Sequence, residues 1–428
     1  MIAVAIGLPV EDGKVRWRDP VKKHLPWLML HDKYAEEHVN IGDMLSMNSG
    51  FGAVSDIADM FGAFASEREY VEALQYLEPD HSLREKPDYA NVNFVTLGQL
   101  IESVSGQTWY EFLKQRVWEP LGMKNTFAST LLAPSEGQAF TAGHFVYDGE
   151  VLGPFDITKD RETFLKVGMG QELNAAGSIV SCAEDMATFI RLLLNKGSVG
   201  DVKLLKSAST IAEMITGKVT ATSTVAQVTK MGLCYDPDGS TLAAGYGIDL
   251  IGQSIWGYPY FDKSGDVSTQ QTRTGFAPTE KLGVIFMANS QVPDPHASFY
   301  LDHYRTYVMG VFLDVPNQIL DFEYQKLRAA DQLQPPFPGA PARSLRFWED
   351  LPIRNLPIRN DRADGDSQLT VTLALSSGPL YYLGEVEGMP SMKIFLGKFA
   401  LGPAILPASV SPSGHYVFNV GISYQKPE

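Results

Sequence analysis

The hydrophobic pattern predicts a helix over the first residues of the sequence. Residues 1–10 are apolar throughout, as in a helix buried on all sides, and Gly13 is a typical residue for ending it. A short extended stretch then leads to a turn at Asp19-Pro20. The apolar run lacks the basic residues and the small-residue cleavage site of a signal peptide, so we interpret it as part of a core.

Three further segments place apolar residues three and four positions apart, which is the spacing of one helix face. They are residues 93–106, 109–117 and 183–194, and Gly106 and Gly197 are stop signals for the first and the last. The apolar positions of these two segments are Phe94, Leu97, Leu100, Ile101, Val104, Met186, Phe189, Leu192 and Leu193.

Strand patterns follow these helices along the chain. Residues 281–289 are a short apolar run that suits a buried strand, and residues 258–263 suit a second strand. We predict one more helix over residues 296–312. Helices, then paired strands, then a returning helix predict an α+β fold.

The chain changes character after a proline-rich stretch. Residues 334–341 cannot continue a helix, so we predict a linker there. Short segments with strand character follow and are separated by Gly, Pro and Ser: residues 368–375, 381–386, 393–399 and 415–424. We therefore predict two domains, an α+β domain at residues 1–333 and a small all-β domain at residues 342–428.

Composition and charge exclude several classes of function. The 428 residues are 44% hydrophobic and 20% charged, which is typical of globular proteins and not of disordered chains or coiled coils. The 50 acidic residues exceed the 35 basic ones, and the net charge of -15 argues against nucleic-acid and anionic-membrane partners. No apolar run reaches the roughly 18 residues of a membrane-spanning helix. Cys182 and Cys234 are too few for a disulfide framework, and we expect a cytoplasmic location.

Three histidines recur at a spacing of seven residues, which raises the question of a metal site. They are His24, His31 and His38. Pro26 interrupts any helix that they could share, and no carboxylate pattern completes a ligand set. We therefore expect surface histidines, and neither a metal nor an organic cofactor is predicted for this chain.

Three short motifs carry candidate chemistry. Tyr89-Ala90-Asn91 leads into the helix at 93–106, Ala175-Ala176-Gly177-Ser178 precedes the helix at 183–194, and Lys263-Ser264-Gly265 ends a predicted strand. Each motif is short enough to occur by chance, so its surroundings decide its meaning.

These surroundings resemble the serine β-lactamase and penicillin-binding protein family, in the branch of class C β-lactamases, D-aminopeptidases, carboxylesterases and acyltransferases. The resemblance covers roughly residues 1–312 and keeps the motifs in order. Besides the three motifs, the matching segments are residues 19–21, 24–26, 41–51, 97–98, 101–106, 120–126, 183–186 and 281–290. The resemblance implies that the first domain is an antiparallel sheet flanked by helices.

The resemblance also implies serine-type acyl transfer. In this family a serine and a lysine stand three residues apart at the start of a helix, so that both project from one face. Tyr89 would be the general base, and a tyrosine needs nearby cations to favour its phenolate at neutral pH. Lys263 would be one such cation, and the lysine of the Ser-x-x-Lys motif would be the other.

The remaining matched residues would bind the substrate. Asn91 would contact its amide carbonyl and Ser264 its polar tail, with Gly265 beside them on the strand. The backbone N–H of Asp266 would be one donor to the oxyanion. A carboxylate at Asp266 would oppose that negative charge, so we expect its side chain to point away from the site.

The chain departs from the family pattern at the nucleophile. No Ser-x-x-Lys lies upstream of Tyr89, and registering residues 11–14 on the family pattern puts the motif lysine just before Met1. The one Ser-x-x-Lys in the sequence is Ser423 to Lys426 in a predicted strand, where such residues point to opposite faces, so we interpret it as accidental. Because a chain that starts inside a core helix leaves the core unfilled, we expect a truncated start; a natural product unable to do serine chemistry is the alternative.

The predicted function is that of a serine-type acyl hydrolase or acyltransferase, acting on an ester, an amide or a lactam through an acyl-enzyme. The alternative is a catalytically inactive binding protein that keeps the pocket. The predicted partner is a small-molecule acyl substrate, while the substrate's identity, hydrolysis against transfer, and the oligomeric state stay open.

Overall fold

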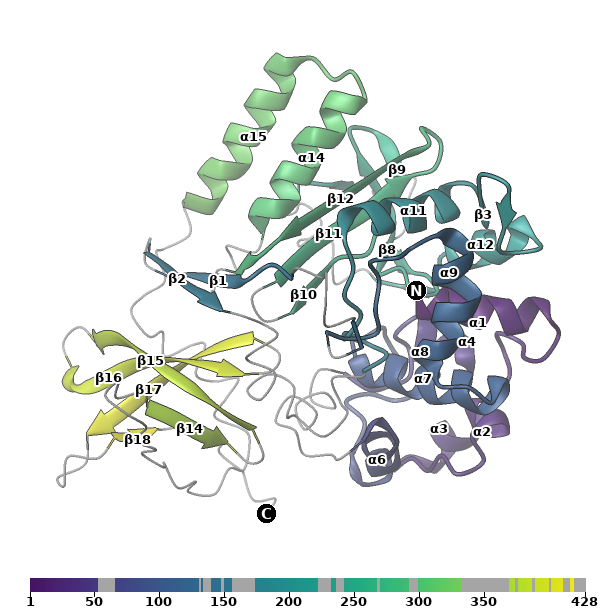
Figure 1. Ribbon diagram of the computed structural model, residues 1–428, viewed down its shortest axis with the longest axis horizontal. Helices are drawn as coiled ribbons and strands as arrows, with labels where there is room; N and C mark the ends of the chain where they lie inside the picture. The colour runs from purple at the N-terminus through teal and green to yellow at the C-terminus, as the bar shows by residue number, and fades with distance from the viewer. Residues whose placement is uncertain are drawn as a thin grey trace.

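The structure of the chain is a computed structural model, drawn in Figure 1. It describes residues 1–52, 66–130, 132–133, 140–147, 150–155, 174–221, 232–235, 242–267, 270–291 and 299–332. It also describes five C-terminal strands at residues 369–373, 376–386, 389–399, 402–410 and 416–418.

Helix α7 (Asn91–Ser105) is the centre of an N-terminal helical region. The region also contains α1 (Ile2–Glu11), α2 (Val21–His24), α3 (Lys33–His38), α4 (Ile41–Leu45), α6 (Glu67–Ala73), the 3-10 turn η1 (Leu74–Tyr76), α8 (Trp109–Leu113), the π-helical turn η2 (Lys114–Trp118) and α9 (Glu119–Leu121). Helix α7 packs against α1, α2, α4, α6 and α8. Leu97, Leu100 and Ile101 are buried there, as their spacing predicts.

The predicted N-terminal helices are confirmed, with shifted ends. Helix α1 ends at Glu11, before Gly13, whose φ of 71° few other residues adopt without strain. Helix α7 begins at Asn91 rather than at residue 93 and stops before Gly106. The helix predicted at residues 109–117 is divided into α8, η2 and α9, because the backbone passes through a π-helical turn.

An antiparallel sheet forms the second part of the domain. Its strands are β5 (Val219–Thr220), β6 (Cys234–Tyr235), β7 (Ala243–Ala244), β8 (Leu250–Ile255), β9 (Tyr258–Asp262), β10 (Gly265–Val267), β11 (Gln270–Ala277) and β12 (Leu282–Ala288). Strand β11 pairs with β12 on one side and with β9 and β10 on the other. Lys263 and Ser264 therefore lie where the chain passes from β9 to β10, beside β11.

Helices α11 (Ala183–Leu194) and α14 (Tyr300–Phe312) cover the two faces of this sheet (Figure 1). Both contact β11 and β12. Phe276 belongs to the same hydrophobic cluster as Phe189 of α11, whereas the next residue, Ala277, belongs to the cluster of Met309 on α14. Successive side chains of a strand point to opposite faces, so the two helices lie on opposite sides.

Most of the predicted sheet and helix elements are confirmed. Strands β9 and β12 match the predictions at residues 258–263 and 281–289, and α11 matches residues 183–194. Helix α14 begins at Tyr300, and residues 292–298 of the predicted helix lie outside the described residues. The sequence pattern missed several other elements, among them the sheet strands β8 and β11. It also missed α12 (Ala208–Met214), α15 (Asn317–Gln332) and the short strands β1 (Gly143–Tyr147), β2 (Glu150–Phe155), β3 (Ser198–Val199), β4 (Val202–Lys203) and β13 (Ser290–Gln291).

The C-terminal strands form a separate five-stranded antiparallel sheet, in the order β14-β15-β16-β17-β18. They are β14 (Leu369–Leu373), β15 (Ser376–Val386), β16 (Met389–Phe399), β17 (Gly402–Val410) and β18 (Tyr416–Phe418). The predicted linker at residues 334–341 lies outside the described residues, so the domain boundary stays a prediction. Within the described part of the chain, no helix is long and apolar enough to cross a membrane.

Glu36 is a buried carboxylate that ties α3 to α2. It accepts a hydrogen bond from the Nζ of Lys22, another from Lys33 at 2.8 Å, and one from the backbone N–H of Leu30 at 2.8 Å. The hydrogen bonds from Lys22 and Lys33 outweigh burial and lower the pKa of Glu36 to about 2. Neighbouring Glu37 also contacts Lys22, at 2.6 Å, but is exposed.

We predict that Glu36→Gln makes the stability of the protein less sensitive to acid. A lowered pKa stabilises the fold above the unfolded value, and this contribution is lost as the pH falls from about 5 to about 2. At neutral pH the variant should lose up to about 3 kcal/mol of unfolding free energy, a difference that shrinks with acidification. Urea titrations at several pH values measure it; Glu37→Gln is the control, and equal losses in both variants would contradict the prediction.

Candidate active site

Tyr89 lies in the loop that enters α7, within the helical region. The hydroxyl of Tyr89 donates to Oδ1 of Asn91 at 3.1 Å, so the two predicted site residues are in contact. Ala90 is fully buried, and one turn into the helix Asn93 accepts a hydrogen bond from Ser49 at 2.7 Å in the core. These contacts fix the start of α7, while the side chain of Tyr89 remains half exposed.

Lys263, directly after strand β9 of the sheet, lies beside Tyr89. Its Nζ lies 5.4 Å from the centroid of the Tyr89 ring, although the two residues belong to different parts of the fold. Nζ also donates to Oδ2 of Asp249 at 2.9 Å. The backbone N–H of Lys263 donates to the carbonyl of Thr274 on β11 at 3.1 Å, and the Thr274 hydroxyl donates back to the carbonyl of Lys263.

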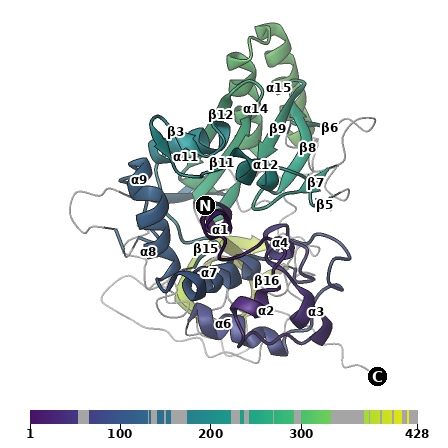
Figure 2. The same ribbon diagram turned by 90° about the vertical axis from the view of Figure 1, so that its right-hand side faces the viewer.

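The electrostatics of Lys263 favour its charged form. Burial alone would lower its pKa, but the charges of Asp249 and Tyr89 and the hydrogen bond to Asp249 outweigh burial and raise the pKa above its ordinary range. Lys263 in turn acts on Met1, where burial and then this positive charge lower the pKa of the amine to about 5. Met1, which caps the N-terminal end of α1, is therefore close to Lys263, and Figure 2 shows α1 between α7 and the sheet.

The residues after Lys263 form the edge strand β10, and their polar side chains contact charged residues. Ser264 donates from its hydroxyl to Asp262 at 3.2 Å. Gly265 is exposed and pairs with Thr272 of β11, whose hydroxyl donates to its carbonyl at 3.0 Å.

Asp266 is also exposed, and its carboxylate accepts from Nη1 of Arg273 at 2.7 Å. The arginine neutralises the carboxylate next to the predicted oxyanion donor. The role of the Asp266 backbone N–H, and the roles of Ser264 and Gly265 toward a substrate, stay predictions.

A buried charge network lies behind this edge of the sheet. Arg305 of α14 is fully buried and pairs with Asp262 at the end of β9 and with Asp302 at 2.9 Å. Asp302 also accepts from Arg273 at 2.8 Å, and Arg273 reaches Asp266. Burial raises the pKa of Asp262 to about 6, although the charge of Arg305 favours the carboxylate. The network connects both sides of Lys263-Ser264-Gly265 to one helix.

Sequence reasoning missed the charged partners of the predicted site. Asp249 and Asp262 flank Lys263 in space, but nothing in their spacing marks them. Asp302 and Arg305 lie three residues apart within a predicted helix, which is the spacing of an ordinary surface ion pair. The only available signal was one acidic and one basic residue within a predicted helix.

The third motif, Ala175-Ala176-Gly177-Ser178, is held by hydrogen bonds and by packing against α7. Ser178 donates to the carbonyl of Ala128 at 2.6 Å and is bonded to the backbone of Asn174. Ala175 is buried against Gly98 of α7. The segment therefore attaches the start of α11 to the helical region.

The three histidines have separate surroundings. His24 contacts Asp19 at 2.9 Å, and His38 stacks on Tyr34 with the ring centroids 4.2 Å apart. Within the residues that the structure describes, no group of three His, Cys, Asp or Glu side chains could hold a metal ion.

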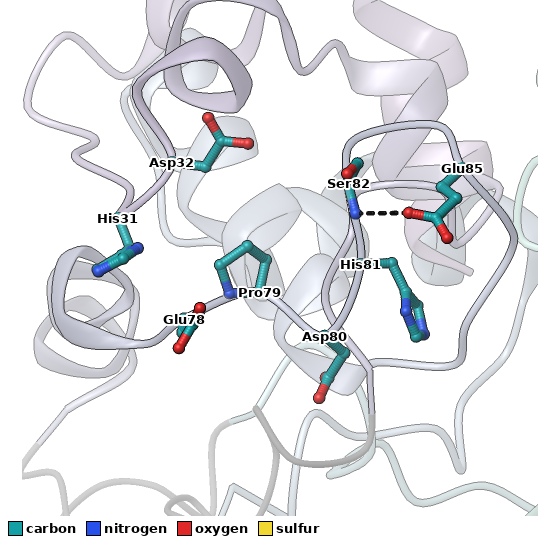
Figure 3. Close-up of a pocket in the computed structure, with 8 residues that line it drawn as sticks. All are labelled: His31, Asp32, Glu78, Pro79, Asp80, His81, Ser82 and Glu85. Carbon is teal, nitrogen blue, oxygen red and sulfur yellow. Dashed lines mark hydrogen bonds between the residues drawn. The ribbon is translucent and has the colours of Figure 1, made fainter. Parts of the chain in front are cut away.

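His31 lines a cavity of about 440 Å³ that shares no residue with the predicted site (Figure 3). Inside it the backbone N–H of Ser82 donates to Glu85 at 3.1 Å. The other residues lining the cavity are Asp32, Glu78, Pro79, Asp80 and His81. The lining is mostly acidic and polar, and it lacks a cation beside a tyrosine.

The fold agrees with that of a known family. The family model described as Beta-lactamase matches residues 1–304, and the chain belongs to this family. The solved penicillin-binding protein homologue from Pyrococcus abyssi, described as octameric, has the same fold, with a TM-score of 0.55 and 20% sequence identity. That match covers 96% of this chain and 82% of the other.

Curated relatives of the chain carry the names of hydrolases. An unguisins hydrolase of Aspergillus campestris is 26% identical over 206 residues, covering 45% of this chain and 36% of that protein. A putative D-alanyl-D-alanine carboxypeptidase of Escherichia coli is 23% identical over 215 residues, covering 46% and 49%. The chain thus matches half or less of the length of these relatives, and they support enzyme activity only at the level of hydrolysis.

We predict that Arg305→Ala strongly destabilises the domain. The change leaves Asp262 and Asp302 buried without their main counter-charge, which typically costs about 3–5 kcal/mol. Chemical unfolding measures the loss. Lys326→Ala is the control, because its pair with Glu323 is exposed and should contribute less than about 1 kcal/mol. A loss for Arg305→Ala as small as that of the control would contradict a buried network.

Proposed function

We propose that the protein is a serine-type acyl hydrolase or acyltransferase that acts on an ester, an amide or a lactam. The observation that carries the proposal is the contact of Lys263 with the Tyr89 ring, close to Met1 at the N-terminal end of α1. A tyrosine close to a fixed cation is suited to remove a proton from a hydroxyl group. Membership of the Beta-lactamase family and relatives named as hydrolases support the same reaction class.

The proposed reaction starts with the hydroxyl of a Ser-x-x-Lys serine ahead of Met1, a serine that the 428 residues do not include. Tyr89, as phenolate, takes the hydroxyl proton while the serine oxygen forms a bond to the acyl carbon. The carbonyl oxygen becomes negative and accepts hydrogen bonds from backbone N–H groups. We propose the backbone N–H of Asp266, on the edge strand β10, as one of these donors. The bond from the acyl carbon to the alcohol oxygen or amine nitrogen breaks as that atom takes the proton from Tyr89, and an acyl-enzyme remains; the alcohol or amine departs from an ester or amide and stays attached in a lactam. Water or an acceptor alcohol then attacks that ester by the same steps.

The other site residues have supporting roles in this proposal. Lys263 stabilises the phenolate of Tyr89 and is held in place by Asp249. Asn91, which accepts from the Tyr89 hydroxyl, orients the base and offers its amide N–H group to the substrate carbonyl. Ser264 and Gly265 line the strand edge along which the substrate would lie.

A catalytically inactive binding protein is the second candidate function. The 428 residues hold no Ser-x-x-Lys before Tyr89, so they do not themselves supply the nucleophile of the first candidate. The two candidates differ in whether a serine at the start of α1 reacts. The comparison needs two proteins, the 428-residue chain and a chain with Ser-x-x-Lys joined in helical register ahead of Met1.

We predict that the extended chain hydrolyses p-nitrophenyl esters and that Tyr89→Phe lowers its kcat/KM by about 10²–10⁴-fold, because general base catalysis is lost. The rate of p-nitrophenol release measures the activity of the extended chain and of its Tyr89→Phe variant. Tyr76→Phe removes the hydroxyl of an exposed tyrosine on η1 and serves as the control. An extended chain with no activity would favour the binding-protein candidate. Activity that survives Tyr89→Phe unchanged would contradict the role of Tyr89 as the general base.

A further inference from the structure

Three side chains at the proposed site have the chemistry to hold a substrate carboxylate. They are the ammonium of Lys263, the hydroxyl of Ser264 and the guanidinium of Arg273. In this structure each of them already contacts a carboxylate of the protein itself. Which acyl substrates the site accepts therefore depends on these internal pairs.

Lys263 is paired with Asp249, and both side chains are partly exposed. The Nζ to Oδ2 distance is 2.9 Å, and the two side chains are 36% and 32% exposed, so a ligand can reach both. Asp249 is fixed by its backbone, whose N–H donates to the carbonyl of Asp262 at 3.3 Å. A ligand carboxylate at Lys263 would lie beside the carboxylate of Asp249, and two like charges at that separation repel each other.

Ser264 and Arg273 are held by the buried network. Ser264 donates its one hydroxyl proton to Asp262, at 3.2 Å to Oδ1, and so presents its lone pairs to a ligand. Arg273 is only 5% exposed and lies between Asp266 and Asp302. Both groups would have to leave an internal carboxylate before they could donate to an external one.

The charge balance of the network points the same way. Asp262, Asp266 and Asp302 stand against the two positive charges of Arg273 and Arg305, and the pair of Lys263 with Asp249 adds no net charge. With every carboxylate ionised, the described groups around Lys263-Ser264-Gly265 carry an excess of negative charge. Such a lining repels anions and attracts neutral or cationic groups.

We propose that the site selects acyl substrates whose end at the Lys263-Ser264-Gly265 strand is neutral or cationic, such as carboxamides, esters and amines, and rejects substrates with a free carboxylate there. Asp249 is the specificity-determining residue, because it is the exposed partner of Lys263. This inference rests on the proposed function, since it takes the acyl site to be the one at Tyr89 and Lys263.

The test measures binding to the 428-residue chain with two probes that differ in one group. N-acetyl-D-alanyl-D-alanine ends in a carboxylate, and N-acetyl-D-alanyl-D-alaninamide ends in a neutral amide. Ligand-detected NMR titrations at neutral pH and low salt give both dissociation constants. We expect the amide to bind at least about tenfold more tightly than the acid, as one hydrogen-bonded charge pair can supply.

Asp249→Asn removes the competing carboxylate while keeping the shape of the side chain. We expect it to strengthen binding of the acid by about tenfold and to change binding of the amide less than about twofold. Glu323→Gln, on α15, makes the same change in net charge and should alter neither constant. An unchanged affinity of Asp249→Asn for the acid would overturn the role of Asp249.

The remaining outcomes separate this inference from the proposed function. Equal or tighter binding of the acid by the unaltered chain overturns the selectivity but leaves an acyl site in place. If neither probe binds the unaltered chain or Asp249→Asn, the proposed function fails and the inference fails with it. The comparison of the two probes on the unaltered chain requires no variant to fold.

Discussion

The buried guanidinium of Arg305 sets the position of the strand edge that carries Lys263. A charge inside a protein is tolerated only when it is paired, and Arg305 is paired with Asp262 and Asp302. Asp262 is the last residue of β9, directly before Lys263, and it also accepts the hydroxyl of Ser264. Ion pairs and hydrogen bonds therefore connect helix α14, on one face of the sheet, to the polar residues at the edge of the sheet.

The helical region contributes the other half of the site. Helix α7 is held by contacts with five neighbouring helices, and its entry loop presents Tyr89 to Lys263. Met1, which caps α1, lies close to Lys263, and α1 lies between the helical region and the sheet. Tyr89, Lys263 and the start of α1 come from three separate segments and lie close together, which suits the proposed acyl transfer and also the binding of an acyl ligand.

Hydrophobic spacing was sufficient to predict α7 and α11, because each buries an apolar face, and it also located β12, in which Val284 is buried. It failed for β17, whose Pro403 and Pro407 argue against a strand in any sequence pattern. The motifs pointed to Tyr89 and Lys263, but not to the acids that control Lys263. Asp249 becomes a neighbour of Lys263 only because β8 pairs with β9, and an i, i+3 pair such as Asp302 and Arg305 has the same sequence pattern on a surface as in a core.

Covalent labelling with a fluorophosphonate probe, followed by peptide mapping, tests the proposed acyl site. We expect a single adduct on the serine of a Ser-x-x-Lys turn joined ahead of Met1, because the proposed reaction puts that hydroxyl beside Tyr89 and Lys263. An adduct on Ser264, whose hydroxyl donates to Asp262, or on any other serine of the 428 residues would overturn the proposal.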